Sequence, residues 1–134
     1  MSQEKILPGG GAGKNISHPI TTLERREIQA PLLVSLIEGF TRELGREKAM
    51  QVASAAIQAD ASQAGKAMAV KFGGSSLREL LQVVMQVWAA DDALEYEILE
   101  QTEKKLSFNV TRCKYVEMYA RLGVKEFGDC LSCQ

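Results

Sequence analysis

Hydrophobic positions follow a helical period through most of the first half of the chain. Apolar residues recur three and four positions apart from Leu33 to Leu44, which predicts a helix that ends at Gly45. A second long helix is predicted from Arg46 to about Phe72. One of its faces consists of small or medium apolar residues, which predicts close packing between helices: Ala49, Val52, Ala53, Ala56, Ile57, Ala64, Ala67 and Met68.

Two local signals divide this helical half further. Thr21 or Thr22 can cap an earlier helix, and a break or kink is expected at Pro31, which lacks an amide hydrogen. Ser76 and Glu79 have the spacing of a capping box, which predicts a third helix whose body runs from Leu77 to Trp88.

The period of the apolar residues then changes from helical to alternating. Residues 94–100 and 106–110 alternate around a short polar turn, which predicts a β-hairpin over about 94–110. Thr111 is expected to cap a helix from Arg112 to Leu122, and a short helix is expected to follow. The predicted class is α+β, with long N-terminal helices packed on a small antiparallel sheet that short helices follow.

Glycine and proline usage indicates how the chain is organised. Residues 1–20 contain four of the eleven glycines and two of the three prolines, which predicts a flexible tail. Residues 21–134 are expected to form a single α+β domain. Because a hairpin needs a third strand or a covering helix, its unfinished edge predicts a C-terminally incomplete domain. A second copy or a second chain is expected to complete the sheet.

Charge and hydropathy limit the partners of the chain. Sixteen basic and seventeen acidic residues give a net charge of -1, so neither nucleic acid nor an anionic membrane is expected as a partner. The first twenty residues have no apolar core like that of a secretion signal. A cytoplasmic location is therefore expected, where cysteines are thiols more often than disulfides.

The three cysteines are the first candidates for chemistry. Cys113 falls in the first turn of a predicted helix, where unpaired amides and the helix dipole stabilise a thiolate. Cys130 and Cys133 are separated by two residues, a spacing that suits a redox pair or half of a zinc site. Simple packing of each cysteine in the core remains an open alternative.

An acidic cluster where the third helix meets the hairpin is the second candidate. Asp91 and Asp92 could share a proton, hold a metal or activate water. The alternative is a solvated turn. The nearby Glu95 and Glu97 are explained by strand alternation alone.

Three segments in the last third of the chain resemble a known family. WAADDALEYEILEQT, FNVTRCKYVEMYARLG and LSCQ, in this order and spacing, are similar to the central part of the L-2-amino-thiazoline-4-carboxylic acid hydrolases. Members of that family continue past the position of Cys133, so the resemblance implies that this chain ends before their last segment.

The resemblance implies a cytoplasmic bacterial hydrolase that opens a small cyclic amidine at a C–N bond, with N-carbamoyl-cysteine as the product of the named reaction. Cys113 and Cys133 would act as nucleophile or as metal ligands, and Asp91 or Asp92 would handle a proton. The substrate would be held by nearby polar side chains, namely Arg112, Asn109, Thr111 and Tyr115. A thiolate and a hydroxide bound to a divalent metal ion both remain open.

Two other functions also remain open. The position of the cysteines near the end of an α+β domain also resembles vinyl-reductase-type domains, which implies a non-catalytic module that binds a small molecule or a metal. The chain could also be an inactive fragment or one half of a two-chain enzyme.

Overall fold

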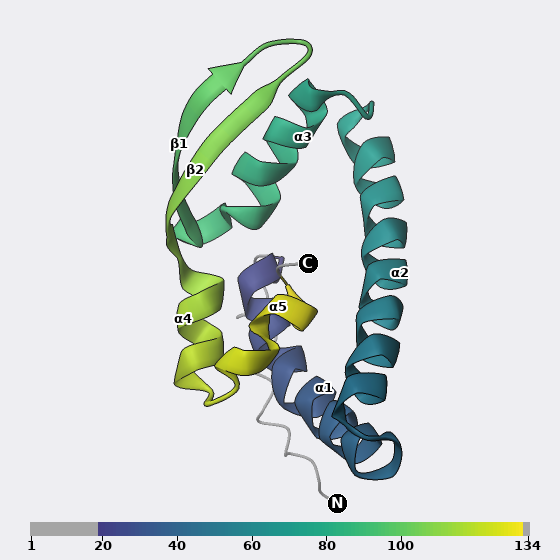
Figure 1. Cartoon of the computed structure of the whole chain (residues 1–134). Coiled ribbons are helices and arrows are strands. Elements are labelled where there is room, and N and C mark those ends of the chain that lie inside the picture. Colours follow the sequence, from purple (N-terminus) through teal and green to yellow (C-terminus); the bar gives the residue numbers. More distant parts are fainter. Residues whose placement is uncertain (1–18, 133–134) are drawn as a thin grey trace, which may run out of the picture.

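The computed structural model describes residues 19–132 (Figure 1). Residues 1–18, which make up most of the expected tail, and Cys133 lie outside this range. The elements follow in the order α1 (Thr22–Leu44), α2 (Arg46–Phe72), α3 (Leu77–Val83), π-helix η2 (Val84–Trp88), 3-10 helix η3 (Ala90–Asp92), β1 (Leu94–Gln101), β2 (Leu106–Cys113), α4 (Lys114–Arg121), 3-10 helix η4 (Lys125–Phe127) and α5 (Gly128–Leu131).

Both long helices form, and α1 starts earlier than the apolar period suggests. The Thr21 hydroxyl accepts a hydrogen bond from the Glu24 amide and caps α1. The expected break at Pro31 is absent, because α1 continues as one helix of 23 residues. The Pro31 ring is exposed, whereas Ala30 and Val34 on either side of it are held in the core.

The buried faces of these helices differ from the predicted ones. On α1 the buried residues are Ala30, Val34 and Ile37, whereas Phe40 and Leu44 are exposed. On α2 only Ala49 and Ala53 of the predicted packing face are buried. The spacing of apolar residues predicts that one face of a helix is buried. Which residues form that face depends on the side from which the neighbouring helices pack.

The predicted capping box at the start of α3 is present. The Ser76 amide donates to Glu79 Oε2 at 3.0 Å, and the Ser76 hydroxyl also donates to this oxygen. These bonds lower the pKa of Glu79 from 4.5 to about 2. After Val83 the helix widens into one π turn, closed by the Ala89 amide on Val84 O at 2.8 Å.

Glu79→Gln should change how stability depends on pH. Because the pKa of Glu79 is lowered by folding, its carboxylate stabilises the fold fully above pH 4.5 and loses this effect as the pH falls to about 2. We expect Glu79→Gln to melt below the wild type at pH 7, and the two melting temperatures to converge near pH 2. Thermal unfolding at several pH values measures this. The exposed Glu38→Gln should follow the wild type; a constant gap for Glu79→Gln down to pH 2 would contradict the argument.

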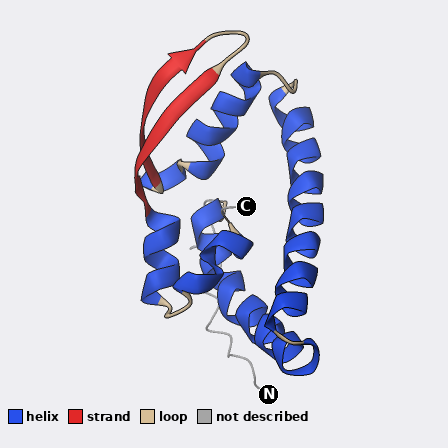
Figure 2. Cartoon of the chain, in the orientation of Figure 1, coloured by secondary structure: helices blue, strands red, loops and turns tan. Residues whose placement is uncertain are grey.

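The hairpin forms and is longer than expected. β1 and β2 are the only strands among residues 19–132 (Figure 2), and β2 continues to Cys113. The predicted helix therefore forms, as α4 (Lys114–Arg121), but its expected start at Arg112 and its expected cap at Thr111 are wrong. The Thr111 hydroxyl instead donates to Glu95 O at 3.1 Å, and Arg112 pairs with Glu95 across the hairpin. These bonds between the strands extend β2 by three residues.

One face of the hairpin is apolar and incompletely covered. Cross-strand pairs place Tyr96 opposite Val110 and Ile98 opposite Phe108, and the rings of Tyr96 and Phe108 meet edge to face with centroids 6.1 Å apart. The start of α3 lies beside the hairpin turn. Even so, Ile98 is 41% and Val110 46% exposed.

The core lies at the other end of the molecule, where α4 and α5 pack against α1 and α2 (Figure 1). Tyr119 and Met118 on α4 are almost fully buried, together with Phe127 and Leu131. Arg121 of α4 pairs with Glu27 of α1 at the surface. The α+β class is thus confirmed.

Candidate functional site

Cys113 lies at the junction of β2 and α4. It is the last residue of β2 and the N-cap of α4, one position before the helix in which it was expected. Its side chain makes no capping hydrogen bond, and it is partly buried against the core. Cys113 is a free cysteine. The amides of the first turn of α4 follow directly, so the helix dipole still favours a negative charge here.

Asp91 and Asp92 are brought to the same junction. Leu94 pairs with Cys113 across the hairpin, and the Lys114 amide donates to Ala93 O at 2.9 Å. The acidic turn therefore runs beside the start of α4. Both aspartates are exposed, and both have left-handed backbone conformations, with φ of 54° and 58°. Aspartate adopts this conformation more readily than most residues other than glycine, which suits it to a tight turn.

Tyr115 connects this junction to the π turn. Its hydroxyl donates to Trp88 O at 2.9 Å, at the end of η2. Burial raises the pKa of Tyr115 to about 12, opposed by the positive charge of Arg26. Tyr115 follows Cys113 by two residues, in the first turn of α4. Tyr115 is thus the expected substrate-binding residue that lies beside Cys113.

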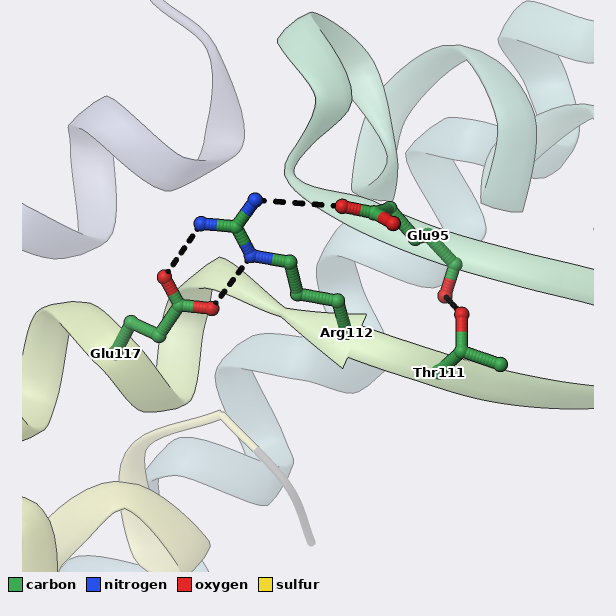
Figure 3. Close-up of polar contacts among 4 residues, drawn as sticks. All are labelled: Glu95, Thr111, Arg112 and Glu117. Carbon is green, nitrogen blue, oxygen red and sulfur yellow. Dashed lines mark hydrogen bonds and ion pairs between the residues drawn. The ribbon is translucent and has the colours of Figure 1, made fainter.

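Arg112 does not share a face of the strand with Cys113. Adjacent strand residues point to opposite faces, and Arg112 points to the polar one. Its guanidinium donates two hydrogen bonds of 2.8 and 2.9 Å to the Glu117 carboxylate and one of 3.3 Å to Glu95 (Figure 3). These carboxylates raise the pKa of Arg112, and the guanidinium in turn lowers the pKa of Glu117. The guanidinium ties β1 and β2 to α4.

Asn109 and Thr111 are also exposed and contact the first strand. The Asn109 amide reaches Glu97 Oε1 at 3.5 Å, and Thr111 is bonded to Glu95 O. The structure therefore brings Cys113, Tyr115 and the acidic turn together, whereas Arg112, Asn109 and Thr111 make a separate polar surface on the hairpin.

The remaining cysteines differ from each other. Cys130 is buried in the core, and burial raises the pKa of its thiol. Cys133 lies outside the described residues. Within residues 19–132 no three histidine, cysteine, aspartate or glutamate side chains gather closely enough to hold a metal ion.

A hollow of about 770 Å³ opens between α1, α2 and α5. This volume is in the range of small-molecule sites. Its wall carries both charged and apolar groups, with Arg26 and Gln29 from α1, Asp60 from α2 and Leu131 and Ser132 from α5. A smaller hollow of about 510 Å³ near the hairpin turn has Arg78 in its wall, which is already paired with Glu79.

Arg26 is a residue that the sequence patterns did not single out. Its side chain lines the hollow and donates to Gln29 Oε1 at 3.1 Å. The signal was present, because Arg26 lies four residues before Ala30 and so extends the buried stripe of α1. The sequence analysis placed the buried side of α1 on a different set of residues, so Arg26 was not recognised as lying on that side.

Comparison with models of known protein families identifies a match. The model of the family described as L-2-amino-thiazoline-4-carboxylic acid hydrolase matches residues 25–134. Neither a curated protein nor a solved structure matches the chain. In the described part of the chain, every helix is too short or too polar to cross a membrane.

Proposed function

The chain belongs to the L-2-amino-thiazoline-4-carboxylic acid hydrolase family, and we propose on this basis that it hydrolyses a small cyclic amidine that bears a carboxylate. The observation that carries the proposal is the family match over residues 25–134. The junction around Cys113 supports it, because a thiol, a buried tyrosine and two carboxylates lie there on neighbouring segments.

The product identifies the bond that is cleaved. Addition of water to the amidine carbon gives a tetrahedral carbon that carries sulfur and nitrogen from the ring. Loss of the ring nitrogen, the expected C–N cleavage, leaves S-carbamoyl-cysteine. Loss of the ring sulfur leaves N-carbamoyl-cysteine with a free thiol. N-carbamoyl-cysteine as product therefore requires C–S cleavage, for which a thiolate is the better leaving group.

In the cysteine mechanism, the Cys113 thiolate adds to the amidine carbon. The ring C–S bond breaks, its electron pair stays on the departing sulfur, and that sulfur takes a proton. Water then adds to the same carbon, loses a proton to Asp91 or Asp92, and the bond to Cys113 breaks to release N-carbamoyl-cysteine. The leaving group is a thiolate in both steps, so neither step has to expel a poor leaving group.

Turnover by the purified chain tests this function. Incubation with L-2-amino-thiazoline-4-carboxylate should produce N-carbamoyl-cysteine, identified by mass spectrometry, together with one new thiol per molecule consumed. If the product is S-carbamoyl-cysteine and no new thiol appears, the enzyme cleaves the C–N bond and not the C–S bond. Absence of any ring opening would overturn the proposed activity for this chain.

We propose further that a second copy completes the sheet through β2. The outer face of β1 carries Glu95, Glu97 and Glu100, whereas residues 106–111 of β2 carry no charge. Antiparallel pairing of two β2 strands therefore avoids repulsion and would cover Val110, which is 46% exposed.

Light scattering after size exclusion should give twice the mass of 14.7 kDa for one chain. Val110→Lys should give a monomer, and Val116→Lys, at an equally exposed site on α4, should not. A monomeric wild type, or a dimer that survives Val110→Lys, would contradict pairing through β2.

A further inference from the structure

The hollow between α1, α2 and α5 has both a cation and an anion in its wall. Arg26 lines it from α1 and Asp60 from α2. Among residues 19–132, neither side chain has an ion-pair partner, whereas Arg46 and Arg121 each have one and Arg112 has two. Two unpaired opposite charges around one concave space match a ligand that carries both charges.

The rest of the wall suits a small organic molecule. Leu33, Ile57 and Leu131 give apolar surface, and Gln29 adds a polar group beside Arg26. A volume of about 770 Å³ leaves room for a five-membered ring with its substituents and some water. Apolar walls with a few placed polar groups are the usual composition of such sites.

We infer that this hollow binds a small zwitterion, with its carboxylate on Arg26 and its protonated amidine or amine on Asp60. The identity of the ligand rests on the proposed function, since 2-amino-thiazoline-4-carboxylate carries these two groups. The site itself does not rest on it. Arg26 therefore takes the role of carboxylate receptor that the sequence assigned to Arg112, whose donors already meet Glu95 and Glu117.

Cys113 does not line the hollow, so binding here and reaction at Cys113 are separate events. Arg26 is in the wall of the hollow and donates to Gln29 Oε1 within it. Variants of Arg26 should accordingly change binding of the zwitterion, whereas Cys113→Ser should leave that binding intact.

Calorimetry on the Cys113→Ser chain, which prevents turnover, tests the inference with three ligands. These are 2-amino-thiazoline-4-carboxylate, 2-amino-thiazoline without the carboxylate, and 2-methyl-thiazoline-4-carboxylate without the amidine. Arg26→Ala should weaken the two carboxylates about 10-fold to 100-fold and leave 2-amino-thiazoline unchanged. Asp60→Asn should weaken the two amidines by a similar factor and spare the 2-methyl compound.

Arg25→Ala is the matched control, since Arg25 is exposed on the same helix and is not in the wall of the hollow. It should bind all three ligands like the parent, and Arg112→Ala should too. The ligands differ only in which charged group they carry, so each variant is compared across ligands on the same protein sample. A general loss of structure would weaken the binding of all three ligands alike. Equal weakening of all three, or a loss in Arg112→Ala instead of Arg26→Ala, would overturn the inference.

The two proposals can fail separately. Ring opening by the wild type, together with ligand binding that Arg26→Ala and Asp60→Asn leave unchanged, would overturn the zwitterion site and keep the hydrolase. Charge-selective binding without any ring opening would keep the site and overturn the hydrolase.

Discussion

Cys113→Ser should reduce ring opening of 2-amino-thiazoline-4-carboxylate by on the order of 10³-fold or more. A serine hydroxyl stays protonated near neutral pH, so it cannot attack the amidine carbon as a thiolate does. Loss of the fold is not expected, because Cys113 is the N-cap of α4 and makes no capping bond, and serine is a preferred N-cap residue. Initial rates with matched circular dichroism spectra measure the effect.

Cys130→Ala is the control for this variant, because Cys130 is buried in the core. It should lower stability and keep the rate per folded molecule. Mass spectrometry of the quenched wild type should find the ring-opened substrate attached to Cys113. Unchanged turnover in Cys113→Ser would exclude Cys113 from the chemistry, and loss of activity with a bound metal but no adduct would favour the metal-hydroxide alternative.

Tyr119→Ala should lower the free energy of unfolding by about 3–5 kcal/mol, the usual range for removing a buried aromatic ring. Tyr119 is 1% exposed and packs close to Gly128, where an added Cβ would lie 3.4 Å from its ring. Its hydroxyl meets Ser132 Oγ at 2.6 Å. Since domains of this size are stable by about 5–15 kcal/mol, a large part of the total would be lost. Urea unfolding at 25 °C measures it.

Two variants separate the ring of Tyr119 from its hydroxyl. Tyr119→Phe should cost only about 0.5–1.5 kcal/mol, the contribution of one hydrogen bond. Val116→Ala, three residues earlier on α4 and 43% exposed, should change stability by no more than about 0.5 kcal/mol. Similar losses for Val116→Ala and Tyr119→Ala would show that the core is not centred on α4.

Signals within a few residues were enough to predict many elements. The capping box of Ser76 and Glu79, the helix ends at Gly45 and Gly73, and the alternating residues of the hairpin all appear where their local chemistry requires. Capping, backbone freedom at glycine and side-chain alternation are set by near neighbours in the chain.

The end of β2 could not be predicted in this way. Thr111 and Arg112 are good candidates to start a helix, yet their bonds to Glu95, sixteen and seventeen residues away, keep them in the strand. Cys113 is consequently the N-cap of α4 at the end of β2, and the Arg112 side chain lies on the opposite face of the strand from Cys113. Contacts across the hairpin outweighed local preference.

The sequence by itself determined the class of the fold and the family, because these depend on local patterns and on motif order. Only the tertiary structure decided which faces of α1 and α2 are buried. It also brought the turn that holds Asp91 and Asp92 to the start of α4, and it placed Arg26 and Asp60 in the wall of one hollow. Each of these depends on how separate helices approach one another, and no periodicity within a single helix contains that information.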